Sequence, residues 1–464
     1  MSNGFCNGQA DSTLSQLLKS ALDAAGFSFA EIEFKRRSEI FFTRLNKLLC
    51  AAADTIYVGS RSEGILGGLY YSGEESDIDA ILPFFEEYDV YDGQSYLDEG
   101  IEKPDINEDP WEYITGYHTL LCSRKTFFAF YDEEFPGYMM IYCLPNTRFS
   151  SSKVHARATH VYIENKQFQH LVRKTDAQDL NITTETTNQF QTNGPAVTEE
   201  CFSSCYFFSS KQESLVSDNV PCLYFDYWPP CAYDWTTRFK PNGWPEDRII
   251  KQIVSHKCML APVGHHDSSD KDVQFRLSIT GENILFQHLN NVQVHCYILL
   301  KIILKDKLRP ILNSDNKDIL SSYCMKNVIF WCVERESVDW TVSNLVCCLQ
   351  ICIRKLILYL QEYYLPHYII KSYDAFGRKK QRNDILTKIN HLSPDDIAVE
   401  NNQVLFYNIL VYCNSKAGYN QRAAKYLVRS LVIFPSQQNA AFGYLKDIVH
   451  QSLTLIRTWN ANAM

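Results

Sequence analysis

The chain lacks the marks of a secreted, membrane-spanning or basic protein. No uncharged apolar run reaches membrane-span length, because the nearest candidate, residues 342–361, is interrupted by Arg354 and Lys355. The first residues, Met-Ser-Asn-Gly-Phe-Cys-Asn-Gly, carry neither a basic region nor an apolar core, so we expect no signal peptide. The formal net charge of −9 argues against a basic nucleic-acid coat, so any nucleic-acid contact must use a local patch.

The 16 cysteines form no recognisable framework for disulfides or metal. The sequence contains no Cys-x-x-Cys pair, and no second pair at zinc-finger spacing follows Cys201 and Cys205. Several thiols, such as Cys347, Cys348 and Cys352, lie in apolar segments. Scattered thiols are typical of a reducing compartment, and we therefore predict a soluble cytoplasmic protein.

The apolar pattern indicates a mixed α/β part followed by a helical part. Helical spacing of leucine and phenylalanine predicts one long helix or a broken pair over residues 12–52, with a break at Gly26. Strand-like runs alternate with polar turns over residues 55–148. Long helical periodicity covers residues 246–260 and 281–366.

Residues 401–452 are typical of a tetratricopeptide-type helical hairpin. Gly418 falls in the expected inter-helix turn, paired alanines follow, and Pro435 comes after a helix. Because fewer than three such repeats do not stand alone, we expect the hairpin to dock on the helical part. A helical cap on the core is favoured over a peptide-binding groove.

An Asp-x-Asp pair is the main candidate for chemistry. Asp77 and Asp79 stand at i and i+2 of a strand-like run, so their carboxylates should share one face. Two carboxylates this close repel unless a cation lies between them, and their hard oxygens suit Mg²⁺. Upstream, Gly59 allows close approach of a phosphate and Ser60 adds a hydroxyl. The pattern predicts a site for a metal-bound nucleoside triphosphate, and the alternative is a solvated strand end.

A series of later motifs resembles a single family. The series runs Asp218-Asn-Val-Pro, Trp228-Pro229, Trp235, Gly243-Trp-Pro, Leu260-Ala-Pro-Val-Gly, Phe275-Arg-Leu-Ser-Ile, Glu282, Lys301, Ser321-Ser-Tyr-Cys-Met-Lys, Phe330-Trp331 and Trp340. In this order the motifs resemble the male-abnormal (Mab) family, which includes cyclic GMP–AMP synthase and the cyclic GMP–AMP synthase-like receptors. The C-terminal hairpin resembles the tail of invertebrate, especially molluscan, members.

The resemblance implies an α+β, bilobal nucleotidyltransferase fold. We expect a nucleotidyltransferase core with an N-terminal spine helix over residues 12–245. A helical lobe is expected over 246–398 and a tetratricopeptide-like helical tail over 399–464. A mixed sheet in the core would carry the catalytic acids, and the helical lobe would close a cleft over it.

The resemblance also assigns the catalytic and metal-binding acids. Asp77 and Asp79 fall on the first two, and Asp218 falls on the third. Asp226 is the alternative for the third position, but the Trp228-Pro229 anchor favours Asp218. Two Mg²⁺ or Mn²⁺ ions held by these carboxylates would activate a ribose hydroxyl and balance the leaving pyrophosphate.

The nucleotide-binding residues follow from the same resemblance. They are Gly59 and Ser60 at a phosphate turn, Arg276 and Ser278 near a base, Glu282 as a polar nucleotide contact, Lys301 and Ser322 at the triphosphate, and Tyr323 stacked on a base. Each has a structural alternative: Arg276 as a salt-bridged strand residue, Tyr323 as core, and Lys301 as a helix residue with a buried stem.

No zinc is expected. The zinc-binding insertion of the vertebrate synthase is absent, since residues 283–296 hold only His288, His295 and Cys296 as candidate ligands. A further set, His256, Cys258, His265 and His266, fits no standard zinc spacing.

The implied function is the joining of ATP and GTP into a cyclic dinucleotide by an innate-immune sensor. Double-stranded RNA or another ligand would switch it on, and a downstream receptor would meet only the product; no membrane partner is expected. Lys35, Arg36 and Arg37 are the candidate nucleic-acid contacts, with Lys153 and Arg157 as additional candidates and a solvated helix face as the alternative. The competing interpretations are a catalytically silent scaffold or developmental interaction protein, and a template-independent RNA terminal transferase.

Overall fold

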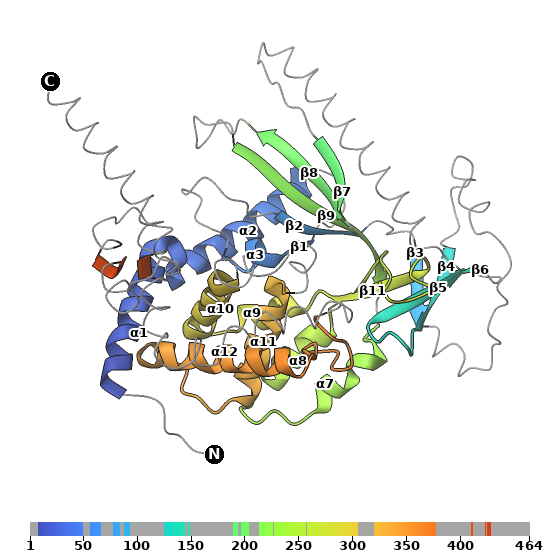
Figure 1. Cartoon of the computed structure of the whole chain (residues 1–464). Coiled ribbons are helices and arrows are strands. Elements are labelled where there is room, and N and C mark those ends of the chain that lie inside the picture. Colours follow the sequence, from blue (N-terminus) through green and yellow to red (C-terminus); the bar gives the residue numbers. More distant parts are fainter. Residues whose placement is uncertain are drawn as a thin grey trace, which may run out of the picture.

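The computed structural model places helices against a long mixed sheet (Figure 1). It describes residues 8–49, 56–65, 78–83, 88–92, 125–143, 147–148, 189–193, 196–203, 213–225, 227–256, 258–304, 320–376, 410–411, 423 and 425–427. The expected mixture of helices and strands is confirmed, whereas the tail predicted over 399–464 lies almost entirely outside the described residues.

Two N-terminal helices meet at a bend. Helix α1 (Gly8–Leu22) and helix α2 (Phe29–Leu49) run in different directions in Figure 1. They are joined by a π-helical turn, η1 (Asp23–Phe27). Gly26 in this turn has φ of 84°, a value that glycine adopts without steric cost. Ser28 then starts α2, because its hydroxyl accepts from the Glu31 backbone N–H and the Glu31 carboxylate accepts from the Ser28 N–H. The predicted break at Gly26 is confirmed.

The sheet is built around one long strand, β9 (Glu213–Phe225). The main path of strands runs β1 (Ile56–Val58), β2 (Ile78–Pro83), β9, β10 (Cys258–Ala261), β11 (Gln274–Ile279), β5 (Tyr138–Cys143), β4 (Lys125–Tyr131) and β3 (Tyr88–Asp92). Off this path, β8 (Ala196–Ser203) pairs with β9, β7 (Gln189–Asn193) pairs with β8, and β6 (Thr147–Arg148) pairs with β5. Strand pairs β2–β9 and β3–β4 are parallel and the others are antiparallel, so the sheet is mixed as expected.

The two faces of the sheet have different surroundings. Phe225, Leu260 and Leu277 point into the main core, where they meet the helices. The alternate residues Cys222 and Met259 belong to a separate small apolar cluster, which also contains Ile81 and Ala261. Because strand side chains alternate between faces, this second face is the one on which polar residues of the same parity must lie.

The helical part covers the main-core face. Its longer helices are α8 (Asp247–Val254), α9 (Glu282–Gln287), α10 (Asn291–Ile303), α11 (Ser322–Arg335) and α12 (Leu345–Gln361), with short turns η2 (Pro230–Ala232), α7 (Tyr233–Thr237) and η5 (Val342–Asn344). Helices α10, α11 and α12 pack on one another, and α1 packs on α12 and η5. Asn290 and Gln293 form a capping box that starts α10.

One predicted element is wrong. The helical periodicity assigned to residues 246–260 ends with α8, and Cys258–Ala261 form strand β10. All four β10 residues are buried, so both faces of this strand are apolar and the sequence shows no alternation. A short continuous apolar run of this kind cannot be told from a buried helix by its period.

Helix α12 is a core helix. The segment Val342–Gln361 is long and apolar enough to cross a membrane by length and composition alone, which is weak grounds for a span. Leu349, Cys352 and Leu356 are buried, and the helix contacts α1, α10 and α11. These contacts match the core helix expected from the sequence.

Candidate functional site

Four neighbouring strands bring the predicted acids together at the level of the backbone. Val58 of β1 pairs with Asp79 of β2, Asp79 pairs with Asp218 of β9, and Asp218 pairs with Thr198 of β8. Paired residues on adjacent strands lie about 5 Å apart. The Thr198 hydroxyl donates to Asp218 Oδ1 over 2.6 Å, which fixes one oxygen of that carboxylate. Asp77 and the alternative third acid, Asp226, lie outside the described residues.

The predicted phosphate turn begins directly after this row. Gly59 follows Val58, has φ of 67°, and opens the four-residue helix α3 (Gly59–Ser62), which packs against β2. The Lys301 ammonium of α10 donates to the Ser60 hydroxyl over 2.6 Å. Two residues predicted as phosphate contacts are therefore hydrogen-bonded to each other between α3 and α10.

Two helices, α2 and α11, hold the end of this turn. The Arg36 guanidinium of α2 donates through Nε to the Glu63 carbonyl over 2.9 Å, and the Lys326 ammonium of α11 forms an ion pair with the Glu63 carboxylate. Gly64 has φ of 73°, and a Cβ at this position would lie 2.5 Å from the Ile32 carbonyl oxygen. Glu63 and Lys326 were not predicted from the sequence, because their partner is set only by the fold.

Arg276 and Ser278 lie on the same face of the sheet as Asp218. Their neighbours in β11, Phe275 and Leu277, enter the main core, so alternation places Arg276 and Ser278 on the opposite face. Arg276 pairs with Ala261, and its charge opposes the effect of burial, which raises the pKa of the Cys222 thiol to about 12. The predicted base-contacting residues therefore share a face with the predicted acid.

Glu282 and Tyr323 form a buried polar cluster with His367. The Tyr323 hydroxyl donates to Glu282 Oε1 and Oε2 over 3.0 and 3.2 Å, and His367 Nε2 lies 2.9 Å from Oε1. Burial and the neighbouring Glu282 carboxylate raise the pKa of Tyr323 well above its usual value. His367 was not predicted from the sequence, since its contact with Glu282 joins two segments that lie far apart in the chain.

Ser322 and Lys301 share an aromatic neighbour. The Tyr297 hydroxyl donates to the Ser322 carbonyl over 3.4 Å, and the Lys301 ammonium lies 5.7 Å from the Tyr297 ring centroid. Ser321, just before Ser322, accepts from the Cys324 backbone N–H and caps α11. The start of α11 is thereby joined to α10 through Tyr297, which also lies beside Lys301.

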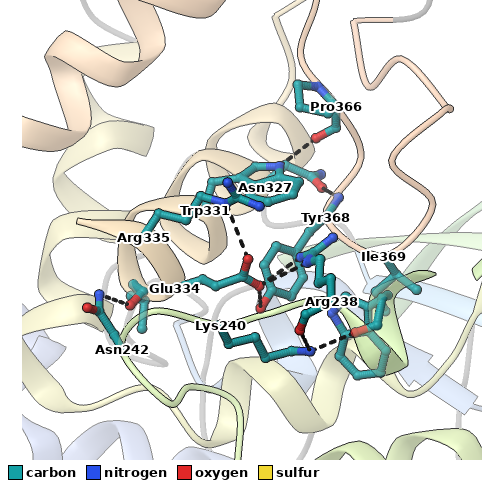
Figure 2. Close-up of polar contacts among 12 residues, drawn as sticks. Arg238, Lys240, Asn242, Asn327, Trp331, Glu334, Arg335, Pro366, Tyr368 and Ile369 are labelled. Atoms are coloured by element: carbon teal, nitrogen blue, oxygen red, sulfur yellow. Dashed lines mark hydrogen bonds and ion pairs between the residues drawn. The ribbon is translucent and has the colours of Figure 1, made fainter. Parts of the chain in front are cut away.

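A second buried network holds the His367 loop against α11 (Figure 2). Trp331 donates to the Pro366 carbonyl over 2.7 Å, and the Tyr368 hydroxyl donates to Glu334 Oε2 over 2.8 Å. The Arg238 guanidinium pairs with the same carboxylate oxygen over 2.8 Å, and the two side chains are only 7% and 0% exposed. This network therefore ties Pro366 and Tyr368, the neighbours of His367 in the chain, to α11.

The three predicted nucleic-acid contacts do not form one basic face. Arg36 is buried, with its guanidinium near the Phe286 ring and the Glu63 carbonyl. Lys35 is half-buried and donates to the Gly26 carbonyl, and burial lowers its pKa. Only Arg37 carries an exposed guanidinium, which pairs with Glu33. The expectation of Arg36 as a surface cation is wrong, because successive helical residues project about 100° apart.

One histidine cluster could offer ligands to a metal. Among the residues that the structure describes, the ligand atoms of His265, His266 and Asp267 lie within 4.8 Å of one another. His265 Nδ1 already accepts from the Asp267 backbone N–H over 3.2 Å, and His266 Nε2 lies 3.2 Å from Asp267 Oδ2. These side chains therefore already contact one another within the loop. The expectation from the sequence that no zinc binds stays a prediction.

The comparison with known families identifies the helical part. Residues 293–392 match the family model described as the Mab-21 protein HhH/H2TH-like domain. The matched segment contains Lys301, Ser322, Tyr323 and His367, whereas the row of strand residues around Asp218 lies outside it. Over the matched residues the comparison agrees with the resemblance noted from the sequence motifs, while the molluscan type stays a prediction. Residues 293–392 of the chain are therefore similar to the C-terminal helical domain of the Mab-21 family.

Proposed function

We propose that this protein is a metal-dependent nucleotidyltransferase. The observation that carries the proposal is the row formed by Val58, Asp79, Asp218 and Thr198, which continues directly into the Gly59–Ser60 turn. Acids on neighbouring strands followed by a phosphate turn are what phosphoryl transfer requires, because that chemistry depends on positioning and charge balance.

The donor set suits divalent cations. Asp218 offers a carboxylate steadied by the Thr198 hydroxyl, and the backbone of Asp79 lies beside it. Such hard oxygen donors fit Mg²⁺ or Mn²⁺, which we expect to be held by Asp77, Asp79 and Asp218. When bound, these ions would lower the pKa of a ribose hydroxyl and offset charge on the departing pyrophosphate.

The remaining residues would bind and orient the nucleotides. Ser60 and the backbone after Gly59 would receive the phosphates, and the Lys301 ammonium would exchange its contact with Ser60 for a phosphate oxygen. Arg276 and Ser278 would meet a base on the sheet face that carries Asp218. Ser322 and Tyr323, at the start of α11, would complete the nucleotide contacts.

The family resemblance supports a more specific product. We infer that ATP and GTP are joined into a cyclic dinucleotide in an innate-immune response, and that double-stranded RNA or another ligand activates the chain in the cytoplasm. Arg37 is the described cation of the Lys35–Arg37 set that best fits an external contact.

The decisive assay is product formation. The purified full chain would be incubated with ATP, GTP and Mg²⁺ or Mn²⁺, with and without double-stranded RNA, and products analysed by mass spectrometry after phosphatase treatment. We expect a phosphatase-resistant dinucleotide that disappears when Asp79→Asn and Asp218→Asn are combined. The same product from the double variant would show that these acids are not catalytic.

A silent scaffold is the second candidate. This candidate is favoured because polar side chains of the proposed site already bond to one another. Lys301 bonds to Ser60, Lys326 to Glu63 and Tyr323 to Glu282. A scaffold of this kind would bind no nucleotide. Calorimetric titration of ATP and GTP separates the two candidates, because the proposed enzyme must bind at least one of them in the presence of metal.

A further inference from the structure

The hydrogen bonds of His367 fix which ring nitrogen carries the proton. Nδ1 lies 3.1 Å from the backbone nitrogen of Ile369 and 2.9 Å from that of Ile370. A backbone N–H can only donate, so Nδ1 must be the unprotonated acceptor. The neutral ring then carries its proton on Nε2, which lies 2.5 Å from the Tyr323 hydroxyl and 2.9 Å from Glu282 Oε1. The Nε2–H of His367 therefore faces both the Glu282 carboxylate and the hydroxyl that donates to it.

Backbone hydrogen bonds join the two ends of the loop that carries His367. The His367 N–H donates to the Tyr373 carbonyl over 2.8 Å, and the Ala375 N–H donates to the Leu365 carbonyl over 2.7 Å. The Tyr368 N–H donates to Asn327 Oδ1 over 2.7 Å, which ties the loop to α11 (Figure 2). The His367 side chain is 6% exposed, so it cannot turn away without breaking this packing.

Glu282 retains acceptor capacity at one oxygen. Among the described contacts, Oε1 receives His367 and Tyr323, whereas Oε2 receives only the Tyr323 hydroxyl at 3.2 Å. A carboxylate offers about four lone-pair positions, and the Glu282 side chain is 14% exposed. The next residue, Asn283, donates to the Tyr57 carbonyl, two residues before Gly59. The start of α9 is thereby linked to β1, the strand that leads into the phosphate turn.

We propose that His367 is a positioning residue, whose Nε2–H aims the Glu282 carboxylate at a hydrogen-bond donor of a bound nucleotide, either a ribose hydroxyl or a base N–H. The part of this inference that concerns a bound nucleotide rests on the proposed function. The link between His367 and Glu282 is independent of that function, because their contact is present in the protein without a ligand.

The hydrogen-bond donors and the lysine around Glu282 favour its ionised form. Burial raises the pKa of this carboxyl, but His367, Lys326 and the Tyr323 hydroxyl outweigh burial, so its pKa is lowered overall. Lys326 is itself paired with Glu63, and Tyr373 lies against the His367 ring. Removing the Nε2–H donor should therefore raise the pKa of Glu282.

Two substitutions at His367 separate its two roles. His367→Asn keeps an acceptor for the Ile369 and Ile370 N–H groups but cannot reach Glu282. His367→Gln places an amide N–H where Nε2 stands, yet leaves those backbone donors without their acceptor. Both variants would be compared with wild type, each with and without Glu282→Gln, in two measurements. These are thermal unfolding of the unliganded chain from pH 8 down to about pH 3, and steady-state kinetics with ATP and GTP.

In the unliganded chain, the Glu282-dependent part of stability is lost as pH falls through the folded pKa of this group. His367→Asn should move that loss to higher pH, and His367→Gln should leave it near the wild-type position while lowering Tm. Tyr323→Phe removes the other donor and should shift the loss in the same direction, so the test survives if His367→Asn does not fold. An unchanged Glu282-dependent profile in both His367→Asn and Tyr323→Phe would overturn the positioning role.

In the kinetic measurement, a Glu282 carboxylate that is no longer oriented by His367 should bind the nucleotide more weakly. KM should then rise about tenfold or more, with little change in kcat. His367→Asn is expected to show this increase and His367→Gln is not. Equal KM values for the two variants would contradict the inference. A wild-type chain that neither binds nor turns over nucleotides would overturn the proposed function together with the part of the inference that concerns a bound nucleotide, while the pH measurement decides the His367–Glu282 link separately.

Discussion

Single buried residues fix how the N-terminal helices meet the helical part. His295 of α10 is 2% exposed, and its Nε2 donates to the Phe27 carbonyl over 2.8 Å, directly after the bend at Gly26. Burial lowers the pKa of His295; the Phe27 contact and Asp23 oppose this effect, and Lys19 adds to it. The neutral imidazole is therefore the form that the folded chain accommodates.

This geometry predicts an acid-sensitive stability. Because the folded pKa of His295 lies below its unfolded value, the unfolded chain binds the proton more readily, and stability should fall as pH drops below about 6.5. His295→Gln keeps an N–H for the Phe27 carbonyl without titrating. Thermal unfolding between pH 7.5 and pH 5 should show a flatter profile for this variant, and a slope identical to wild type would exclude His295 as the source.

At the scale of elements, the turn after α3 depends on close contact with α2. Gly64 combines φ of 73° with a Cβ position 2.5 Å from the Ile32 carbonyl oxygen. Gly26 and Gly243 also have positive φ, but a Cβ at either would meet nothing within 4 Å. Gly64 therefore carries a packing constraint in addition to a backbone one.

Gly64→Ala should destabilise the chain by roughly 2–3 kcal/mol, whereas Gly243→Ala should cost only about 1 kcal/mol of backbone strain. Chemical unfolding of the two variants gives the comparison directly. We also expect Gly64→Ala to weaken nucleotide binding, because the α3 turn must shift away from α2. Equal destabilisation by both substitutions would show that the close contact with Ile32 is unimportant.

The loop before α8 is joined to α11 through a buried ion pair. Glu334 receives Arg238 and Tyr368 at the same oxygen, and the Arg238 guanidinium lies 4.3 Å from the Trp331 ring centroid (Figure 2). Removing one member leaves an uncompensated buried charge. Such pairs are costly to break even where they add little net stability.

Glu334→Ala is therefore expected to lower the free energy of unfolding by about 3–5 kcal/mol. The matched control is Arg335→Ala, since the half-exposed Arg335 contacts the same carboxylate over 3.3 Å. An exposed partner of this kind contributes at most about 1 kcal/mol. Urea unfolding should rank the two in that order, and a small effect of Glu334→Ala would show that the pair is not critical.

At the scale of the whole molecule, the sequence predicted elements better than contacts. The runs Ile56–Val58 and Ile78–Pro83 are strands as expected, because alternation and flanking turns mark them locally. The pairing of Asp79 with Asp218 joins distant segments, and it was reached only through the family resemblance and not from spacing. His367 and Glu63 were missed, since nothing near them in sequence indicates a long-range polar partner.

For the basic segment of α2, neighbouring residues suggested a shared surface that the fold does not form. Three adjacent cations suggested one surface, but helical geometry sends Lys35, Arg36 and Arg37 in different directions. Arg36 then meets Glu63 inside the fold. Counting the helical period over α2 would have predicted at most one of the three on any given face.

The central claim is that the strand acids hold divalent ions, and Mn²⁺ binding tests it most directly. Mn²⁺ affinity would be measured by electron paramagnetic resonance in the presence of a non-hydrolysable ATP analogue. Combining Asp79→Asn with Asp218→Asn should weaken Mn²⁺ binding at least tenfold, whereas Asp267→Asn, in the histidine cluster, should leave it unchanged. Wild-type Mn²⁺ affinity in the double variant, or loss of binding in Asp267→Asn alone, would contradict the account.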